Sequence, residues 1–414
     1  MNAENNFLKN HIILQSLIVI NYLIYLLNVN KFFILINIVL ILFFFFKILI
    51  NKFIHHLLFS KIIIIVYAII SLGSPLTEWD GRSIWLFHAK RVFYEGIYSL
   101  LDNYFPESHN DYPLLAATLS SSLAFLINGW NEIFPKFSNI ILICSPILVL
   151  SSVVKSKIRE IIFIFVILFV LHAKILTGEM DAILALYFVL SSICTFYLFF
   201  NDKNKNIKKN DNSRLLFFYT SVNLIIFSLI RPEAFGVIII ILFTYFLIDL
   251  LFFKRIKKNI KKISILMFSL IPILHWKYIV YKANIVTITE SLFNFHQFSQ
   301  KILDFKAHLK LFQLFFFNSH SILSLIFVSF VFLKLFKFND KNIEILINKK
   351  NIKSNLISIL LILICVIYYL TISIAILSNT MPIDPFIELG KNIFRYNLAI
   401  SFCLCYAAIL IRLK

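Results

Sequence analysis

The sequence has little charge, glycine or proline for its length. Charged residues make up 15% of the 414 residues, and there are 7 glycines and 9 prolines. These residues lie almost wholly between long apolar runs, and no Gly/Ser-rich or low-complexity linker divides the chain. The absence of linkers argues against a string of separate domains. We therefore expect a single integral membrane domain over residues 1–414.

Cysteine and histidine are also sparse, and neither shows a metal-binding pattern. The histidines have no HExxH or His-x-His spacing, which argues against a catalytic zinc site. The cysteines all lie inside apolar stretches, where we expect small buried hydrophobic residues rather than disulfides or metal ligands. They are Cys144, Cys194, Cys365, Cys403 and Cys405.

Apolar sequence dominates the chain. Hydrophobic residues make up 60% of it, including 47 phenylalanines, whereas soluble proteins are about 45–50% apolar. A helix needs about 20 apolar residues to cross a bilayer, so the recurring runs predict an all-α, polytopic integral membrane protein with about 12–13 transmembrane helices. The runs lie near 8–29, 32–50, 54–73, 113–128, 137–154, 160–176, 181–200, 214–230, 234–253, 263–281, 321–336, 355–377 and 393–412.

The formal net charge of +19 comes from lysines that gather in short clusters between the apolar runs. Basic clusters beside spans mark cytoplasmic loops and attract anionic headgroups. We therefore expect membrane lipids, and no nucleic acid, as partners. The clusters run from Lys203 to Lys209, Lys254 to Lys262 and Lys334 to Lys353.

The lysine clusters also orient the chain. With these clusters in the cytoplasm, the polar segments 74–112, 282–320 and 378–392 and the turn at Arg231-Pro232-Glu233 all fall on the external face. The segment 282–320 fits either a second interfacial helix over a site or a solvated loop with aromatic anchors.

One basic turn, Lys155 to Arg159, conflicts with this orientation because two apolar runs separate it from the external loop. Either 113–128 or 137–154 does not cross fully, or this turn breaks the rule. Partial spans are tolerated where protein covers them, so we favour a partial span.

Residues 82–98 of the 74–112 loop have the pattern of a helix lying in the membrane interface. Apolar and aromatic residues recur on one face, with rings suited to headgroup depth. The helix is either part of a site or only an interfacial anchor. The first face carries Trp85, Ala89, Val92 and Phe93, and the other carries His88, Arg91 and Glu95.

Asp80 stands at the predicted end of a span, between Trp79 and Gly81. A carboxylate partly desolvated by aromatic rings can act as a general base, and Gly81 would let a bulky substrate approach the backbone. By spacing alone, Asp80 is equally a solvated loop acid.

Two further groups of polar residues stand at span ends. Asp181 follows an apolar run and is a functional suspect, but it also fits an acid stabilised by the dipole at a helix N-terminus. Arg231 and Glu233 either pair with each other at the Pro232 turn, or Arg231 faces a phosphate while Glu233 orients it.

Taken in order, these residues resemble the GT-C superfamily of membrane glycosyltransferases, and most closely the bacterial relatives of the dolichyl-phosphate-mannose-protein mannosyltransferase group (glycosyltransferase family 39-like). The sequence departs from that pattern at Ala234, where the family has Gly. We also expect three spans rather than one before the loop, and no large soluble C-terminal domain. The matching positions are Asp80, Trp85, Lys90, His109-Asn110-Asp111-Tyr112-Pro113, Gly178-Glu179-Met180-Asp181, Arg231-Pro232-Glu233 and Arg395-Tyr396.

The resemblance implies inverting transfer of a sugar from a polyprenyl-phosphate donor to a glycan, lipid or protein acceptor. The reaction would take place on the external face of a bacterial inner membrane. Asp80 would be the general base, Asp181 a second catalytic residue, and a monophosphate leaving group makes a divalent cation optional. The substrate-binding residues would be Trp85, Lys90, His109, Asp111, Tyr112, Glu179, Arg231, Glu233, Lys391 and Arg395.

The alternatives are a polysaccharide polymerase, or a transporter or flippase with Asp181, Glu233 and Arg395 lining its pathway. Transporters usually carry charges deep within spans and interrupted helices near the midplane. Here the charges cluster at span ends on one face, which favours an enzyme.

Overall fold

The computed structural model describes residues 2–51, 57–74, 78–105, 108–154, 156–200, 210–248, 256–285, 352–377 and 385–410, with single helical positions at 250, 309 and 326. Within these ranges the regular structure is entirely helical. The elements are α1 (Asn2–Leu26), α2 (Lys31–Ile50), α3 (Leu58–Gly73), η2 (Gly81–Trp85), α4 (Leu86–Glu95), η3 (Ile97–Leu100), α5 (Leu115–Leu126), α6 (Phe137–Val154), α7 (Lys157–Val166), η5 (Ile167–Leu171), α8 (His172–Leu176), α9 (Asp181–Phe200), α10 (Asn210–Ser228), α11 (Glu233–Ile248), α12 (Ile256–Met267), η8 (Phe268–Leu270), α13 (Ile271–Lys282), α17 (Ile352–Leu377) and α18 (Pro385–Leu410).

Among the described residues, 6 helices are long and apolar enough to cross a membrane. Shorter apolar helices stand at Leu58–Gly73, Leu115–Leu126, Ser213–Ser228, Glu233–Ile248 and Asn397–Leu410. The expected helical membrane protein is therefore supported, while the larger number of spans stays a prediction. The long segments are Asn5–Leu26, Lys31–Ile50, Phe137–Val154, Asp181–Phe199, Ile260–Lys282 and Leu356–Ser373.

The helix lengths distinguish the two runs, 113–128 and 137–154, in one of which a partial span was expected. The helix in the run 113–128 is α5, which has 12 residues and is therefore about 18 Å long, well short of a bilayer core of about 30 Å. The next run forms the 18-residue α6, which is long enough. The run 160–176, expected as one span, is divided into α7, the π-helical turn η5 and α8.

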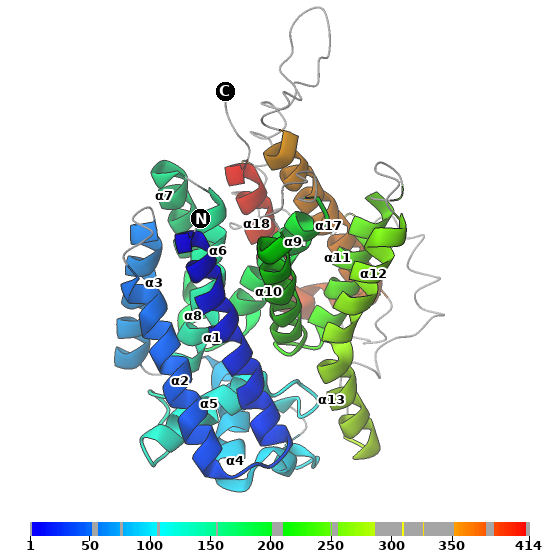
Figure 1. The fold of residues 1–414 in the computed structure, drawn as a ribbon. Helices are drawn as coiled ribbons and strands as arrows, with labels where there is room; N and C mark the ends of the chain where they lie inside the picture. The colour runs from blue at the N-terminus through cyan, green and yellow to red at the C-terminus, as the bar shows by residue number, and fades with distance from the viewer. Residues whose placement is uncertain are drawn as a thin grey trace, which may run out of the picture. The chain divides into compact units, whose positions relative to one another are not determined.

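The chain forms two compact units, which are considered separately below. Unit 1 comprises Met1–Glu160 and Ala173–Thr287, and unit 2 comprises Ile161–His172 and Ile288–Lys414. In unit 1, α1 packs along α2 and α10, while α5 packs on α4, α1 and α2. Figure 1 shows α4 and α5 (cyan) at the end of the α1–α2 pair that lies away from the N-terminus. The single-domain expectation stays a prediction.

The interior of unit 1 is formed by α6 and α9. The apolar windows of these helices are 89% and 94% buried, against 33% for α2. Helices that are apolar all round belong at the centre of a bundle, and both helices are of this type. The outer helices present large hydrophobic side chains instead, including Phe43 and Ile69.

Polar side chains connect α1 to the interior of unit 1. His11 Nδ1 hydrogen-bonds to Ser145 Oγ at 3.0 Å, and the same hydroxyl lies 3.1 Å from Tyr219 Oη. Further along α1, Asn21 Oδ1 accepts from Ser122 Oγ at 2.8 Å. Hydrogen bonds between helices stabilise packing where apolar burial alone gives little preference. These bonds connect α1 to α5 and α6, and α6 to α10.

In unit 2, α17 and α18 pack along each other, and η5 packs against α18. Phe163 lies edge-on to Tyr406, with the ring centroids 5.4 Å apart. Ser358 Oγ donates to Ala407 O at 2.8 Å. The expected burial of the cysteines is confirmed in both units, for Cys144, Cys194, Cys365, Cys403 and Cys405.

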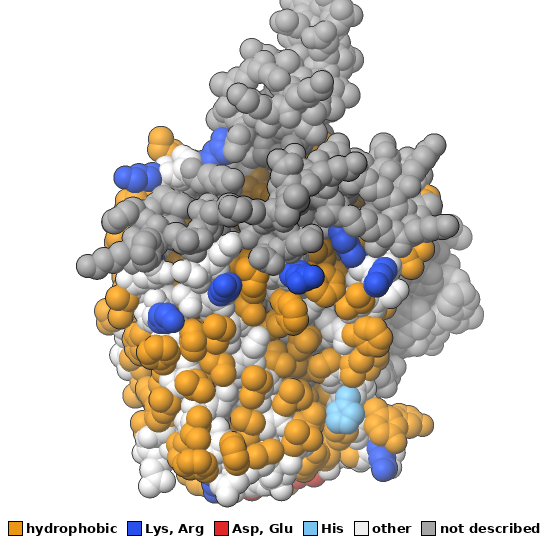
Figure 2. All heavy atoms as spheres, viewed as in Figure 1, with side chains coloured by type: hydrophobic (Ala, Val, Ile, Leu, Met, Phe, Trp, Pro, Cys, Tyr) orange, Lys and Arg blue, Asp and Glu red, His pale blue; other side chains and the backbone are white. Residues whose placement is uncertain are grey.

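The surface over α1, α2 and α3 is mostly hydrophobic (Figure 2). Lys and Arg side chains form a row across this view, and Asp and Glu side chains are visible only at its lower edge, away from that row. A broad apolar face bounded by basic side chains is typical of a protein surface that faces lipid.

Candidate functional site

The candidate site is built around Arg231, which lies in the turn between α10 and α11. Arg231 Nη1 donates to Asp181 Oδ1, and Arg231 Nη2 donates to Glu233 Oε1 at 3.0 Å. The guanidinium carbon also lies over the ring of Tyr112, 5.7 Å from its centroid. Arg231 is 7% exposed and Asp181 3% exposed, so both charges are largely removed from water.

The partners of Arg231 come from the starts of two helices. Asp181 is the first residue of α9 and Glu233 the first of α11, and the dipole at each helix N-terminus stabilises a carboxylate there. The pairing of Arg231 with Glu233 at the Pro232 turn is therefore present, and Asp181 joins it from 50 residues away. The contact with Asp181 is the one that sequence spacing did not suggest.

Glu179 is buried just before α9, at 2% exposure. Its carboxylate pairs with Lys174 Nζ at 2.6 Å, and Lys174 lies in the short helix α8. Between the two, Gly178 has a φ of +80°. A left-handed backbone of this kind favours glycine, and here it turns the chain from α8 into α9. Lys174 was not among the residues expected at the site.

Aromatic rings cover the Arg231 side of the site. Tyr112 stacks on His109 with ring centroids 4.6 Å apart and an interplanar angle of 21°. Trp85, from the π-helical turn η2, lies 5.7 Å from the Tyr112 ring. Trp85 and Tyr112 are 6% and 5% exposed, so in this conformation the rings pack against protein. Three separate segments predicted to bind substrate thus meet at Arg231.

Asp111 lies beside this group and is held from a distant helix. His109 Nδ1 lies 4.0 Å from Asp111 Oδ1. The indole nitrogen of Trp276, which is fully buried in α13, donates to the backbone oxygen of Asp111 at 3.1 Å. Trp276 was missed by the sequence analysis because it lies within an apolar run, where an aromatic residue is usually part of the core.

Asp80 lies immediately before the π-helical turn η2 and is partly exposed. In this turn Leu86 N donates to Gly81 O, and the same turn carries Trp85 into the aromatic group. Short π-helical segments occur often at functional sites. The helix expected over 82–98 is present as η2 and α4 but ends at Glu95, with Lys90 exposed on it, and its place in the membrane interface stays a prediction.

Lys391 and Arg395 lie in α18, whose backbone is described, whereas their side chains lie outside the described residues. They belong to unit 2. Their expected contact with a lipid phosphate stays a prediction. Most of the segment 282–320 also lies outside the described residues.

His88 corrects the expected faces of the interfacial helix. It was placed on the polar face with Arg91 and Glu95, yet it is fully buried in α4 together with Ala89 and Val92. Burial lowers the pKa of His88 to about 3, and the nearby Asn110 side chain, which favours the protonated ring, only partly opposes this effect. The imidazole is therefore neutral at ordinary pH.

The buried His88 predicts acid sensitivity. Its folded pKa of about 3 lies below the ordinary value of 6.5, so the unfolded chain takes up a proton first, and stability should fall as pH drops from about 6.5 toward 3. We expect His88→Gln to flatten this part of the plot of unfolding temperature against pH. An equal slope for wild type and His88→Gln would contradict the prediction.

Acidic side chains outnumber basic ones at the site. Among the described residues, no group of three or more His, Cys, Asp or Glu side chains is placed to hold a metal ion. The site contains several carboxylates that can accept protons or hydrogen bonds from hydroxyl groups. Arg231 and Lys174 pair with them, and aromatic rings border them. Such a set suits a substrate rich in hydroxyl groups.

The chain was compared with protein families, curated proteins and solved structures. No protein-family model matches the chain, and no match was found among curated proteins or among solved structures.

Proposed function

We propose that this protein is a GT-C-type membrane glycosyltransferase that moves a sugar from a polyprenyl-phosphate donor to an acceptor on the external face of the membrane. The observation that carries this proposal is the meeting of Trp85, His109, Tyr112, Asp181 and Glu233 around Arg231. These positions were selected by their order along the chain, which is independent of their contacts in space.

The proposed reaction needs a base and a stabilised leaving group. A hydroxyl oxygen of the acceptor forms a bond to the anomeric carbon while the bond from that carbon to the phosphate oxygen breaks, which inverts the configuration. Asp80 accepts the hydroxyl proton. The bonding electrons leave with the polyprenyl phosphate, whose growing negative charge requires preorganised cations.

The contacts of Arg231 suggest its role in this reaction. Both ends of its guanidinium group are bonded to carboxylates, so we assign it to holding Asp181 and Glu233 rather than to the phosphate. The phosphate contact expected of Lys391 and Arg395 rests on the sequence resemblance alone, and Lys174 is a further cation near Glu179. An Arg at headgroup depth suits a phosphate because its planar fork can donate two parallel hydrogen bonds.

The transporter alternative draws on the buried polar side chains of α1. His11, Gln15 and Asn21 are fully buried within a helix long enough to cross the membrane. Polar groups at such depth often mark a pathway. Two of these three side chains, however, hydrogen-bond to neighbouring helices, as expected for contacts that stabilise helix packing. We therefore retain the enzyme as the proposal.

The proposal is tested by mass spectrometry of surface glycans and lipids from matched cells with and without the gene. A transferase predicts the loss of one defined sugar from a product and the accumulation of its polyprenyl-phosphate donor. Restoring the gene with Asp80→Asn should not restore the product. An unchanged set of sugars in cells that lack the protein would contradict the enzyme proposal. An intact lipid-linked sugar held on the cytoplasmic face would point to a flippase.

A further inference from the structure

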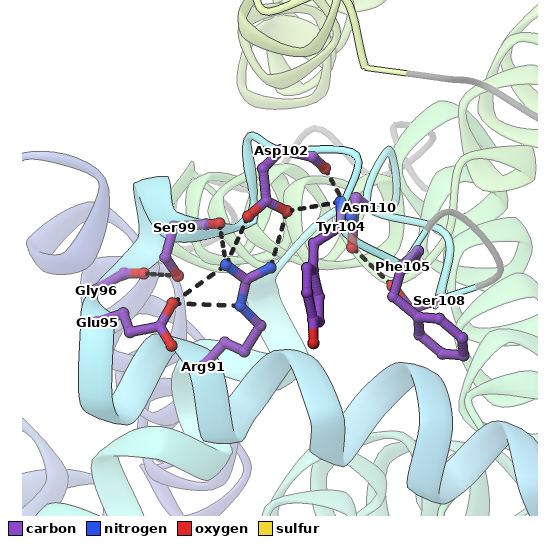
Figure 3. A network of polar contacts seen from close by, with 9 residues as sticks. All are labelled: Arg91, Glu95, Gly96, Ser99, Asp102, Tyr104, Phe105, Ser108 and Asn110. Atoms are coloured by element: carbon purple, nitrogen blue, oxygen red, sulfur yellow. Dashed lines mark hydrogen bonds and ion pairs between the residues drawn. The ribbon is translucent and has the colours of Figure 1, made fainter.

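Arg91, on α4, makes a dense set of polar contacts outside the Arg231 group (Figure 3). Its Nη1 and Nη2 donate to Asp102 Oδ1 and Oδ2, both at 2.9 Å. Nη2 also donates to Glu95 Oε2 at 3.1 Å and to the backbone oxygen of Ser99. The Arg91 side chain is 14% exposed. Hydrogen bonding to Arg91 lowers the pKa of Asp102, and the same contact raises the pKa of Arg91.

Asp102 also connects Arg91 to residues further along the chain. Its backbone oxygen accepts from Asn110 Nδ2 at 2.8 Å, and Asn110 Oδ1 accepts from Ser108 Oγ at 2.7 Å. Asn110 is 1% exposed, so its amide is held away from competing water. Arg91 is thereby connected through Asp102 to the residue that stands between His109 and Asp111.

The backbone explains why this segment needs to be held. Gly96 has a φ of +88° at the end of α4, and this turn brings Ser99 and Asp102 back over Arg91. His109 has a φ of +56°, a conformation that is uncommon for residues other than glycine and is maintained only by surrounding contacts. Tyr112 N donates to His109 O at 2.9 Å and closes the turn that precedes α5.

We propose that Arg91 is a positioning residue that sets the conformation of the segment His109–Tyr112. The link runs from the Arg91–Asp102 fork to the Asn110 side chain, and it places His109 and Tyr112 against Arg231 and Trp85. A bidentate Arg–carboxylate pair combines strength with a fixed direction, which suits it to this role. The catalytic consequence rests on the proposed function, whereas the structural one does not.

If the Arg91–Asp102 pair were an ordinary surface ion pair, it would not restrict the segment His109–Tyr112. Exposed pairs contribute little to stability, and their removal would not change the backbone around them. The Arg91 pair is only half of this kind: the Asp102 side chain is 44% exposed, but the Arg91 side chain is 14% exposed and the Asp102 backbone oxygen also accepts from Asn110. We therefore expect a local and measurable loosening when either link is cut.

Hydrogen–deuterium exchange on the full-length protein in lipid nanodiscs tests this directly. Arg91→Met removes the fork, and Asn110→Ala cuts the second link without changing the ion pair. Each should raise exchange of the amides in residues 97–112 by about tenfold, as expected for the loss of a local closed state. Arg91→Lys should give a smaller increase because lysine cannot make the bidentate contact. The matched control is Arg82→Met, which removes an exposed cation from the adjacent η2 and should have no effect.

The reversed pair Arg91→Asp with Asp102→Arg should recover protection of residues 97–112, at least in part. Two results would overturn the proposal. One is unchanged exchange of residues 97–112 in both Arg91→Met and Asn110→Ala. The other is an equal increase throughout α9, which would mean general destabilisation rather than positioning.

The enzyme assay separates this proposal from the proposed function. If a sugar is transferred, Arg91→Met should lower kcat by about 100-fold, the scale associated with a small misplacement of reacting groups, with little change in KM for the donor. If no sugar is transferred, the exchange experiment still decides whether Arg91 positions the segment.

Discussion

Arg231→Met is expected to destabilise unit 1 by about 3–5 kcal/mol, the scale found when one partner of a buried ion pair is removed. The substitution keeps much of the side-chain volume but leaves the carboxylates of Asp181 and Glu233 without their cation. Asp181 is 3% exposed, so water cannot readily replace the guanidinium group. A lower yield of folded protein and a lower unfolding temperature in detergent would be the measured result.

The same experiment can separate loss of charge pairing from loss of packing. Adding Asp181→Asn and Glu233→Gln to Arg231→Met removes the uncompensated charges and should restore a large part of the stability. Arg214→Met is the matched control, because Arg214 is exposed on α10. An unfolding temperature for Arg231→Met within about 2 °C of wild type, a shift too small for a loss of several kcal/mol, would contradict the role assigned to Arg231.

Asp80→Asn is expected to reduce sugar transfer by about 10²–10⁴-fold, the range associated with a positioned general base. Asparagine keeps the shape of the side chain but cannot accept a proton at neutral pH. Because Asp80 is partly exposed and lies at the start of η2, the change should leave protein abundance and unfolding temperature unaltered. The rate of product formation, normalised to protein, is the quantity to measure.

Glu78→Gln is the control for Asp80→Asn, since Glu78 is an exposed acid in the same segment. It should retain nearly full activity. If Asp80→Asn retains activity within a few-fold of wild type while transfer itself is established, Asp80 is not the base. Asp181 and Glu179 would then be the carboxylates to replace next.

Much of the helical framework could be read from local sequence. The run of apolar residues in α2 and the run in α9 each have the length that lipid demands, and the structure forms a helix at both. The spacing of Trp85, Ala89 and Val92 predicted the helix of the 74–112 loop, because side chains at such intervals share one helical face. The buried cysteines followed equally from their apolar surroundings.

Other features were missed or left open. His88 was assigned to the polar face by its residue type, although helical spacing puts it on the same face as Trp85, Ala89 and Val92, where residues Ser108 to Asn110 lie close to its buried ring. The lysine-based orientation favoured a partial span in 113–128 or 137–154 without saying which, and the short helix is α5, in the first of these runs. The π-helical turn beside Asp80 shifts the helical register of the residues that follow it. No pattern in the sequence predicted this turn.

The candidate site divides in the same way. Which segments carry polar residues at span ends could be read from residue order, because a charged side chain in the apolar interior is costly and charged residues therefore stand out between the apolar runs. Which of these residues meet depended on how the helices pack. The partner of Arg231 is set by how α9 packs against α10 and α11, and that packing depends on side-chain shapes from several helices at once. The contacts of Asp102 with Arg91 and Asn110 similarly required the chain reversal at Gly96, since pairing between charges depends on distance in space rather than on their order in the chain.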